Sequence, residues 1–192
     1  MTLSDYRKEL ISVQAFAFAL PVISTFFDPR AVTFPPMGDD SGPYRFVAMA
    51  IAGLSALLPY FLLPKSRRGL VFGILFALFV ISGCIYVELY ANYVVTIPRP
   101  SGSPVFVIRG TLRNPNLKPP YDKMSDEQLI EHAGQKDDEL ELAYSRSSLV
   151  ANRAKVFWAY VTALVFLELF LGSCAAEMKR PQRDRPIPDN QK

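Results

Sequence analysis

The sequence predicts a mainly α-helical, polytopic membrane protein: a four-helix transmembrane bundle with a small α+β (ββαα) extracytoplasmic insertion between the third and fourth spans. Half of its 192 residues are apolar. These residues are collected into four blocks, and almost every charge lies between or outside the blocks. A soluble domain scatters its charges, whereas a chain that crosses a bilayer sorts them in this way.

The four apolar blocks predict spans at residues 10–27, 44–63, 69–93 and 155–176. The first block is close to the lower limit of roughly 17 residues for crossing a ~30 Å hydrocarbon core. Pro21 and Pro59 lie inside the first and second blocks, where we expect kinks because proline removes a helical hydrogen bond. The connection at residues 64–68 is short, so we expect the second and third spans to be adjacent antiparallel helices.

Basic residues beside the spans predict that both termini are cytoplasmic, because cytoplasmic loops carry an excess of Lys and Arg. Those expected to contact anionic lipid or a cytoplasmic partner are Lys65, Arg67, Arg68, Lys179 and Arg180. Residues 1–9 and the proline-rich tail at residues 177–192 then face the cytoplasm, while residues 28–43 and 94–154 are extracytoplasmic. The absence of glycosylation sequons from those outer segments favours the inner membrane of a bacterium.

The connection at residues 94–154 predicts a small folded domain. Two β-rich runs, at residues 93–97 and 105–113, flank a Pro/Gly/Ser turn and predict a hairpin. Ser125 and Gln128 form a capping-box pattern and Gly134 is a stop signal, so a short helix is expected between them. A second, acidic helix should follow, and the chain should then continue as one helix into the fourth span. A unit this small should rest on the span ends or on a partner.

Ionisable and polar groups inside a span are costly and usually face a bundle interior, a cavity or a partner. Glu168 is expected in the inner half of the fourth span, and Gln14 at a comparable depth in the first. A Glu168–Gln14 hydrogen bond or snorkelling towards the basic turn is one interpretation, and a cation or proton site on a pathway is the other. Glu88 is expected at the outer interface among Tyr86 and Tyr90.

Small residues in the second span predict a close helix contact. Ala48, Ala52 and Ala56 recur every four residues, with Gly53 beside them. Small side chains let two helix backbones approach closely in a membrane. The pattern leaves open whether the contact lies within one chain or between chains.

The chemistry-bearing residues favour a protein that is not an enzyme and uses neither cofactor nor metal. His132 is the only histidine, and the two cysteines lie inside apolar blocks. Nucleotide-binding, nucleophile-elbow and zinc-protease motifs are absent from the sequence. A net charge of +3 without an aromatic-interleaved basic stripe does not predict nucleic-acid binding.

Four spans with both ends inside and a larger second outer loop resemble the tetraspanin plan in outline. The sequence departs from that plan because residues 94–154 contain no cysteine, and hence no CCG motif. We therefore expect a sensing or scaffolding subunit of a membrane complex, such as one used in bacterial stress or phage defence. Its partners would be the lipid bilayer and either further copies of itself or another membrane or cytoplasmic protein. The alternative is a homo-oligomeric pore or transporter-like effector with Glu168 near the permeation path.

Overall fold

The protein is mostly helical. The computed structural model describes residues 4, 5, 7, 8, 10, 11, 34–37, 41–62, 68–97, 104–134 and 136–178. The long helices are α2 (Ser41–Leu62), α3 (Arg68–Tyr93) and α6 (Arg146–Met178). Between α3 and α6 lie β1 (Val94–Ile97), β2 (Val105–Ile108), the 3₁₀ turn η1 (Tyr121–Lys123), α4 (Asp126–Ala133) and α5 (Asp137–Ala143).

Three of the described helices are long and apolar enough to cross a membrane. Their apolar stretches are Ser41–Pro59, Leu70–Tyr93 and Arg146–Ala176. The sequence predicted an apolar helix of spanning length in each of these regions, and this part of the prediction is confirmed. The span expected at residues 10–27, including Gln14, lies outside the described residues apart from Leu10 and Ile11.

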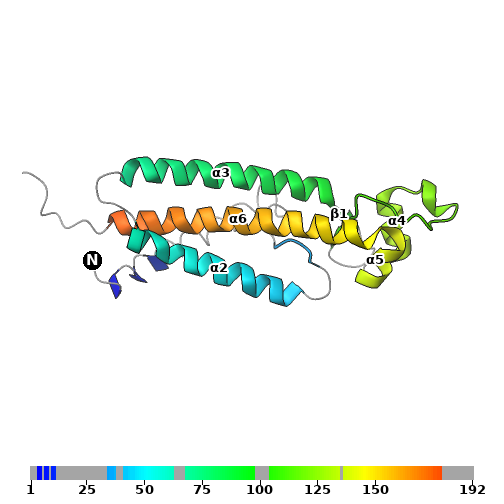
Figure 1. The fold of residues 1–192 in the computed structure, drawn as a ribbon, viewed down its shortest axis with the longest axis horizontal. Helices are drawn as coiled ribbons and strands as arrows, with labels where there is room; N and C mark the ends of the chain where they lie inside the picture. Colours follow the sequence, from blue (N-terminus) through cyan, green and yellow to red (C-terminus); the bar gives the residue numbers. More distant parts are fainter. Residues whose placement is uncertain are drawn as a thin grey trace, which may run out of the picture.

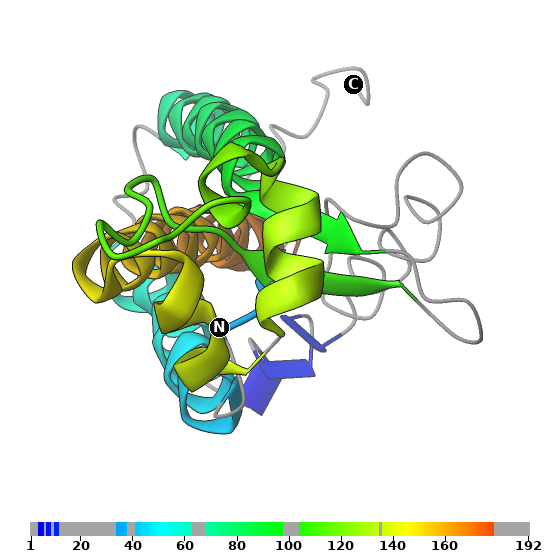
Figure 2. The same cartoon turned by 90° about the vertical axis from the view of Figure 1, so that its right-hand side faces the viewer.

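The three long helices form a layer with α6 in the middle (Figure 1). An end-on view shows the same order, with α3 and α2 on opposite sides of α6 (Figure 2). Ala48 packs near Val156 and Val161, and Ala56 packs near Ala175, so α2 and α6 run in the same direction. The second and third spans are antiparallel, as expected, but the expectation that they are adjacent is wrong, because both pack on α6. A short connection sets the direction of two helices, but in a membrane small residues and shape decide which helices touch.

The described residues 94–97, 104–134 and 136–149 form a compact unit that we call the small domain. As predicted, β1 and β2 form an antiparallel hairpin, in which Val94 pairs with Ile108 and Ile97 with Val105. The predicted capping box of α4 is also present: the Gln128 backbone N–H donates to Ser125 Oγ at 3.2 Å, and the Gln128 side chain accepts from the Ser125 N–H. Gly134 ends α4 with a φ of 108°, a conformation that glycine adopts without steric strain.

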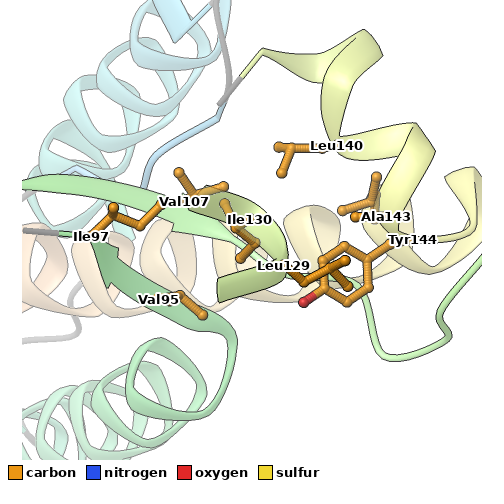
Figure 3. Close-up of a cluster of buried hydrophobic side chains, with 9 residues drawn as sticks. Val95, Ile97, Val107, Leu129, Ile130, Leu140, Ala143 and Tyr144 are labelled. Carbon is orange, nitrogen blue, oxygen red and sulfur yellow. The ribbon is translucent and has the colours of Figure 1, made fainter. Parts of the chain in front are cut away.

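The small domain has its own apolar core. Side chains from the hairpin, α4 and α5 converge there (Figure 3). The core consists of Val95, Ile97, Val107, Leu129, Ile130, Leu140, Ala143, Tyr144 and Leu149. Since Leu149 belongs to the first turn of α6, the same helix that crosses the bundle also closes this core.

A second cluster of buried side chains lies where the small domain meets the bundle. Ile108 of β2, Tyr86 and Tyr90 of α3, and Val156 and Phe157 of α6 belong to it. Residues 34–37 return to the same place, where Phe34 makes edge contacts with Phe157 and Tyr160 at ring-centroid distances of 6.5 and 5.4 Å. The small domain is therefore continuous with the bundle core and does not hang from a flexible linker.

Candidate binding pocket at the domain junction

Four charged and polar side chains meet where α3 passes into the small domain. Arg109 directly follows β2, and Arg113 lies four residues further along. Asp126 is the first residue of α4, and Tyr144 directly follows α5. We call the space between them the junction pocket. The hairpin, the start of α4 and the end of α5 each contribute to it, so the site exists only in the folded small domain.

Arg109 connects the end of α3 to the small domain. Its Nε and Nη2 groups donate hydrogen bonds to the Asn92 carbonyl at 3.0 and 2.8 Å. Asn92 lies in the last turn of α3, where free carbonyls and the helix dipole favour a cation. The Nη1 group of the same guanidinium forms an ion pair with Asp126. A carboxylate in the first turn of α4 is equally favoured by that helix's dipole.

Arg113 binds the other oxygen of the same carboxylate. Its Nη2 donates to Asp126 Oδ1 at 3.2 Å and to the Met124 carbonyl at 2.7 Å. Its Nη1 donates to the Asp122 carbonyl at 2.8 Å. Arg113 therefore orders the segment that leads into α4, and Asp126 is shared between two guanidinium groups.

The pKa values of this cluster follow from its contacts. Burial by itself would raise the pKa of Asp126, but the nearby Tyr144 hydroxyl, the hydrogen bonds from Arg109 and Arg113 and the Arg109 charge outweigh it, so the pKa is lowered. Burial, followed by the neighbouring Asp126 carboxylate, raises the pKa of Tyr144. Asp126 is thus ionised and Tyr144 is protonated at neutral pH, which leaves the tyrosine hydroxyl as a hydrogen-bond donor.

The Tyr144 side chain is 1% exposed. Its hydroxyl is close enough to Asp126 to affect that group's pKa, yet it makes no hydrogen bond of normal geometry among the described residues. A buried hydroxyl without a good partner costs stability, so such a group needs a physical explanation. In this protein it lies on the wall of a cavity.

The cavity has a volume of about 270 Å³. Its lining residues are Tyr93, Arg109, Gly110, Thr111, Arg113, Asp126 and Tyr144. Two guanidinium groups and one carboxylate among these residues leave the pocket with an excess of positive charge. Tyr93 is the last residue of α3, so the pocket lies at the end of an apolar stretch that could cross a membrane.

The lining segment Arg109–Thr111 is joined to α6 by a buried asparagine and a close glycine contact. Asn152 Nδ2 donates to the Arg109 carbonyl at 2.9 Å and to Thr111 Oγ1 at 2.8 Å. A Cβ atom added to Gly110 would lie 2.5 Å from Tyr144 Cβ and 2.6 Å from Ser148 Oγ. Only glycine allows the chain to approach α6 this closely. The pocket and α6 therefore form one packed unit.

The residues that the sequence singled out lie elsewhere. Glu168 is half-buried on α6, and Glu88 is exposed on α3. Ala48, Ala52 and Ala56 are buried on α2, whereas a Cβ at Gly53 would meet nothing within 4 Å among the described residues. Lys65, Arg67, Lys179 and Arg180 lie outside the described residues, and only the backbone of Arg68, at the start of α3, is described.

Sequence reasoning missed the residues of the junction pocket. The sequence showed Asp126 only as part of a capping pattern, and it placed Arg109 and Arg113 inside the predicted β-rich run at residues 105–113. No local pattern in the sequence predicted that these residues would form one site. An acid at the first position of a helix and two arginines four residues apart are each common by themselves. His132 of α4 lies outside the pocket, with its Nε2 atom 3.0 Å from the Tyr121 hydroxyl.

Among the described residues, no three His, Cys, Asp or Glu side chains are grouped so that they could hold a metal ion. Neither a family model, nor a curated protein, nor a solved structure matches the chain.

Proposed function

We propose that this chain is a non-enzymatic, multi-pass membrane protein that acts as a sensing or scaffolding subunit of a membrane complex. The observation that carries this proposal is the continuity of α6. This 33-residue helix contributes Leu149 to the core of the small domain and Ala175 to a contact near the other end of the bundle. At 1.5 Å per residue it spans about 50 Å without a break.

The small domain is joined equally directly to α3. Strand β1 begins at Val94, the residue after the end of α3. Arg109 then holds the last turn of α3 against Asp126 of α4. A change in the small domain therefore displaces two membrane helices together, which is what a sensing subunit requires. These direct connections also hold the small domain in a fixed position relative to α3 and α6, which suits a scaffold that presents a surface to a partner.

The proposal includes four spans, with the first at residues 10–27, and both termini in the cytoplasm of a bacterial cell. The distribution of basic residues supports this orientation, since Lys65, Arg67 and Arg68 lie between two spans and Lys179 and Arg180 follow the last. The small domain then faces the outside.

This orientation can be tested with single cysteines introduced at Ser103 and Ser66 in a protein that lacks Cys84 and Cys174. Ser103→Cys should react with an impermeant maleimide in intact cells, and Ser66→Cys only after lysis; the reverse pattern contradicts the orientation.

The functional class is tested by the mass and composition of the particle purified in detergent and in nanodiscs. A defined complex with another protein, in constant stoichiometry, supports a sensing or scaffolding subunit. A monomer that carries no partner in either medium contradicts it.

A homo-oligomeric pore is the alternative, favoured by the half-buried position of Glu168 on the central helix α6. It predicts that the particle is a ring of identical chains and that it conducts ions in liposomes. The flux should change several-fold in Glu168→Gln, because the neutral amide keeps the size of the side chain but removes its charge. The absence of flux from a homo-oligomeric particle rules this alternative out.

A further inference from the structure

Among the described residues, the guanidinium groups of the junction pocket have N–H donors that no hydrogen bond uses. Each guanidinium carries five N–H donors. Arg109 uses three of them on Asn92 and Asp126, and Arg113 uses three on Asp122, Met124 and Asp126. Each arginine is thus held in place by protein contacts and still has two N–H groups outside these bonds. Such pre-positioned donors bind an anion with little loss of side-chain entropy.

The Tyr144 hydroxyl supplies a donor from a different element. It is buried, it lines the cavity, and it has no hydrogen bond of normal geometry among the described residues. An acceptor oxygen in the cavity would satisfy it. Because Asp126 is the only acidic residue among the described lining residues, two positive charges face one negative charge. The pocket therefore selects an acceptor that carries negative charge.

The size and position of the cavity further restrict the class of ligand that it can bind. A volume of about 270 Å³ is just below the range of about 300–1,000 Å³ for drug-sized ligands. It accommodates a phosphate group and a few attached atoms. Tyr93 places it at the end of the apolar stretch of α3, the level at which phospholipid phosphates lie in a bilayer.

We propose that the junction pocket binds a phosphate group, held by Arg109 and Arg113 and by a hydrogen bond from the Tyr144 hydroxyl. The phosphate belongs either to a phospholipid headgroup or to a soluble phosphate compound. Arginine is well suited to both, because its planar fork matches the geometry of phosphate oxygens. The inference rests on the proposed sensing role for its biological meaning, since it names the ligand class that the small domain would sense.

The test measures binding to the purified, delipidated full-length protein in a maltoside detergent, which contains no phosphate. Inorganic phosphate and soluble short-chain phosphatidylglycerol are titrated separately by calorimetry, against sodium chloride of equal ionic strength. We expect saturable binding of at least one of them. Inorganic phosphate alone indicates a soluble ligand, and phosphatidylglycerol alone or with higher affinity indicates a headgroup. If neither binds, the cavity holds only water and the proposal is wrong.

The decisive variant is Tyr144→Phe, which removes the hydroxyl and keeps the aromatic ring in the core. Loss of one hydrogen bond to a charged group should weaken binding about tenfold. Tyr121→Phe is the matched control, since its hydroxyl contacts His132 outside the pocket. Arg146→Gln is a charge control, because Arg146 pairs with Glu141 at an exposed site. Both controls should bind like the original protein. Equal binding by Tyr144→Phe, or an equal loss in Tyr121→Phe, contradicts the assignment.

The test of phosphate binding can fail or succeed independently of the test of the proposed function. Phosphate binding by a chain that purifies as a lone monomer supports the pocket and contradicts the complex. A stable complex without phosphate binding does the reverse.

Discussion

The bundle and the small domain are held together by different kinds of contact. In the bundle, the buried hydroxyls of Ser55, Ser82 and Ser173 donate to carbonyls three or four residues earlier in their own helices. These bonds do not connect one helix to another. In the small domain, Arg109 and Asn152 join segments 17 and 43 residues apart. The positions of the α3 and α6 ends are therefore determined most strictly in the small domain.

On the proposal that the long helices cross a bilayer and the small domain lies outside it, the contrast follows from the solvent around each part. Membrane helices gain little from exchanging lipid for apolar protein contacts, so they associate through small residues and shape. The buried Ala48, Ala52 and Ala56 on α2 are such a surface. The core of the small domain excludes water, so both apolar burial and directed polar bonds stabilise its fold. Substitutions should therefore have larger and more localised effects in the small domain.

The largest effect is expected from Ile130→Ala in the core of the small domain. Ile130 is 0% exposed, and removing its side chain leaves a cavity that costs about 2–5 kcal/mol. Leu142→Ala is the matched control, because Leu142 is 66% exposed. Hydrogen exchange in detergent should show loss of protection in α4 and α5, with α2 retained. Equal loss of protection in α2 would mean that the two parts unfold as one unit.

The next largest effect is expected from Gly110→Ala, which acts on the contact between the small domain and α6. The new Cβ collides with Tyr144 and Ser148, and overpacking of this kind costs about 1–3 kcal/mol. Gly53→Ala is the control, because nothing described lies within 4 Å of its Cβ position and alanine favours a helix. Thermal unfolding should separate the two variants. A Gly53→Ala variant that loses as much stability would indicate a contact, such as one with another copy, that the single chain lacks.

A smaller effect, dependent on pH, is expected from Asp126. Its folded-state pKa is lowered, so the stability it adds is present above the unfolded value of about 3.9 and is lost as the pH falls below it. Asp126→Asn should lose on the order of 1 kcal/mol at pH 7. The variant should also show a shallower fall in unfolding temperature between about pH 5 and pH 3. An unchanged acid profile would show that other carboxylates cause the fall.

The smallest effect on folding is expected from Glu168→Gln, because the amide keeps the shape of the side chain and can still form hydrogen bonds. The unfolding temperature in detergent should change by less than a few degrees. Glu168→Leu tests the packing interpretation and should disturb assembly more than Glu168→Gln does. Indistinguishable assembly and stability of the two variants would contradict a hydrogen-bonding role in the bundle.

Features that depend on neighbouring residues could be predicted from the sequence. The cap of α4 involves Ser125, Gln128 and Gly134, all within ten residues, and the continuous α6 follows from an unbroken helical pattern. The pocket could not be predicted in this way. Arg109 and Tyr144 are brought together by packing of the hairpin against α4 and α5, and neither residue has a local pattern that indicates its partner.

By itself, the sequence determined which segments are apolar helices, where the hairpin lies and how α4 begins and ends. These properties depend on hydrophobic run length and on hydrogen bonds between near neighbours. Only the tertiary structure decided that α6 separates α2 from α3 and that Arg109, Arg113, Asp126 and Tyr144 surround one cavity. The sequence of an apolar helix in lipid only weakly specifies which helices it packs against. A site built from distant segments exists only after those segments have packed.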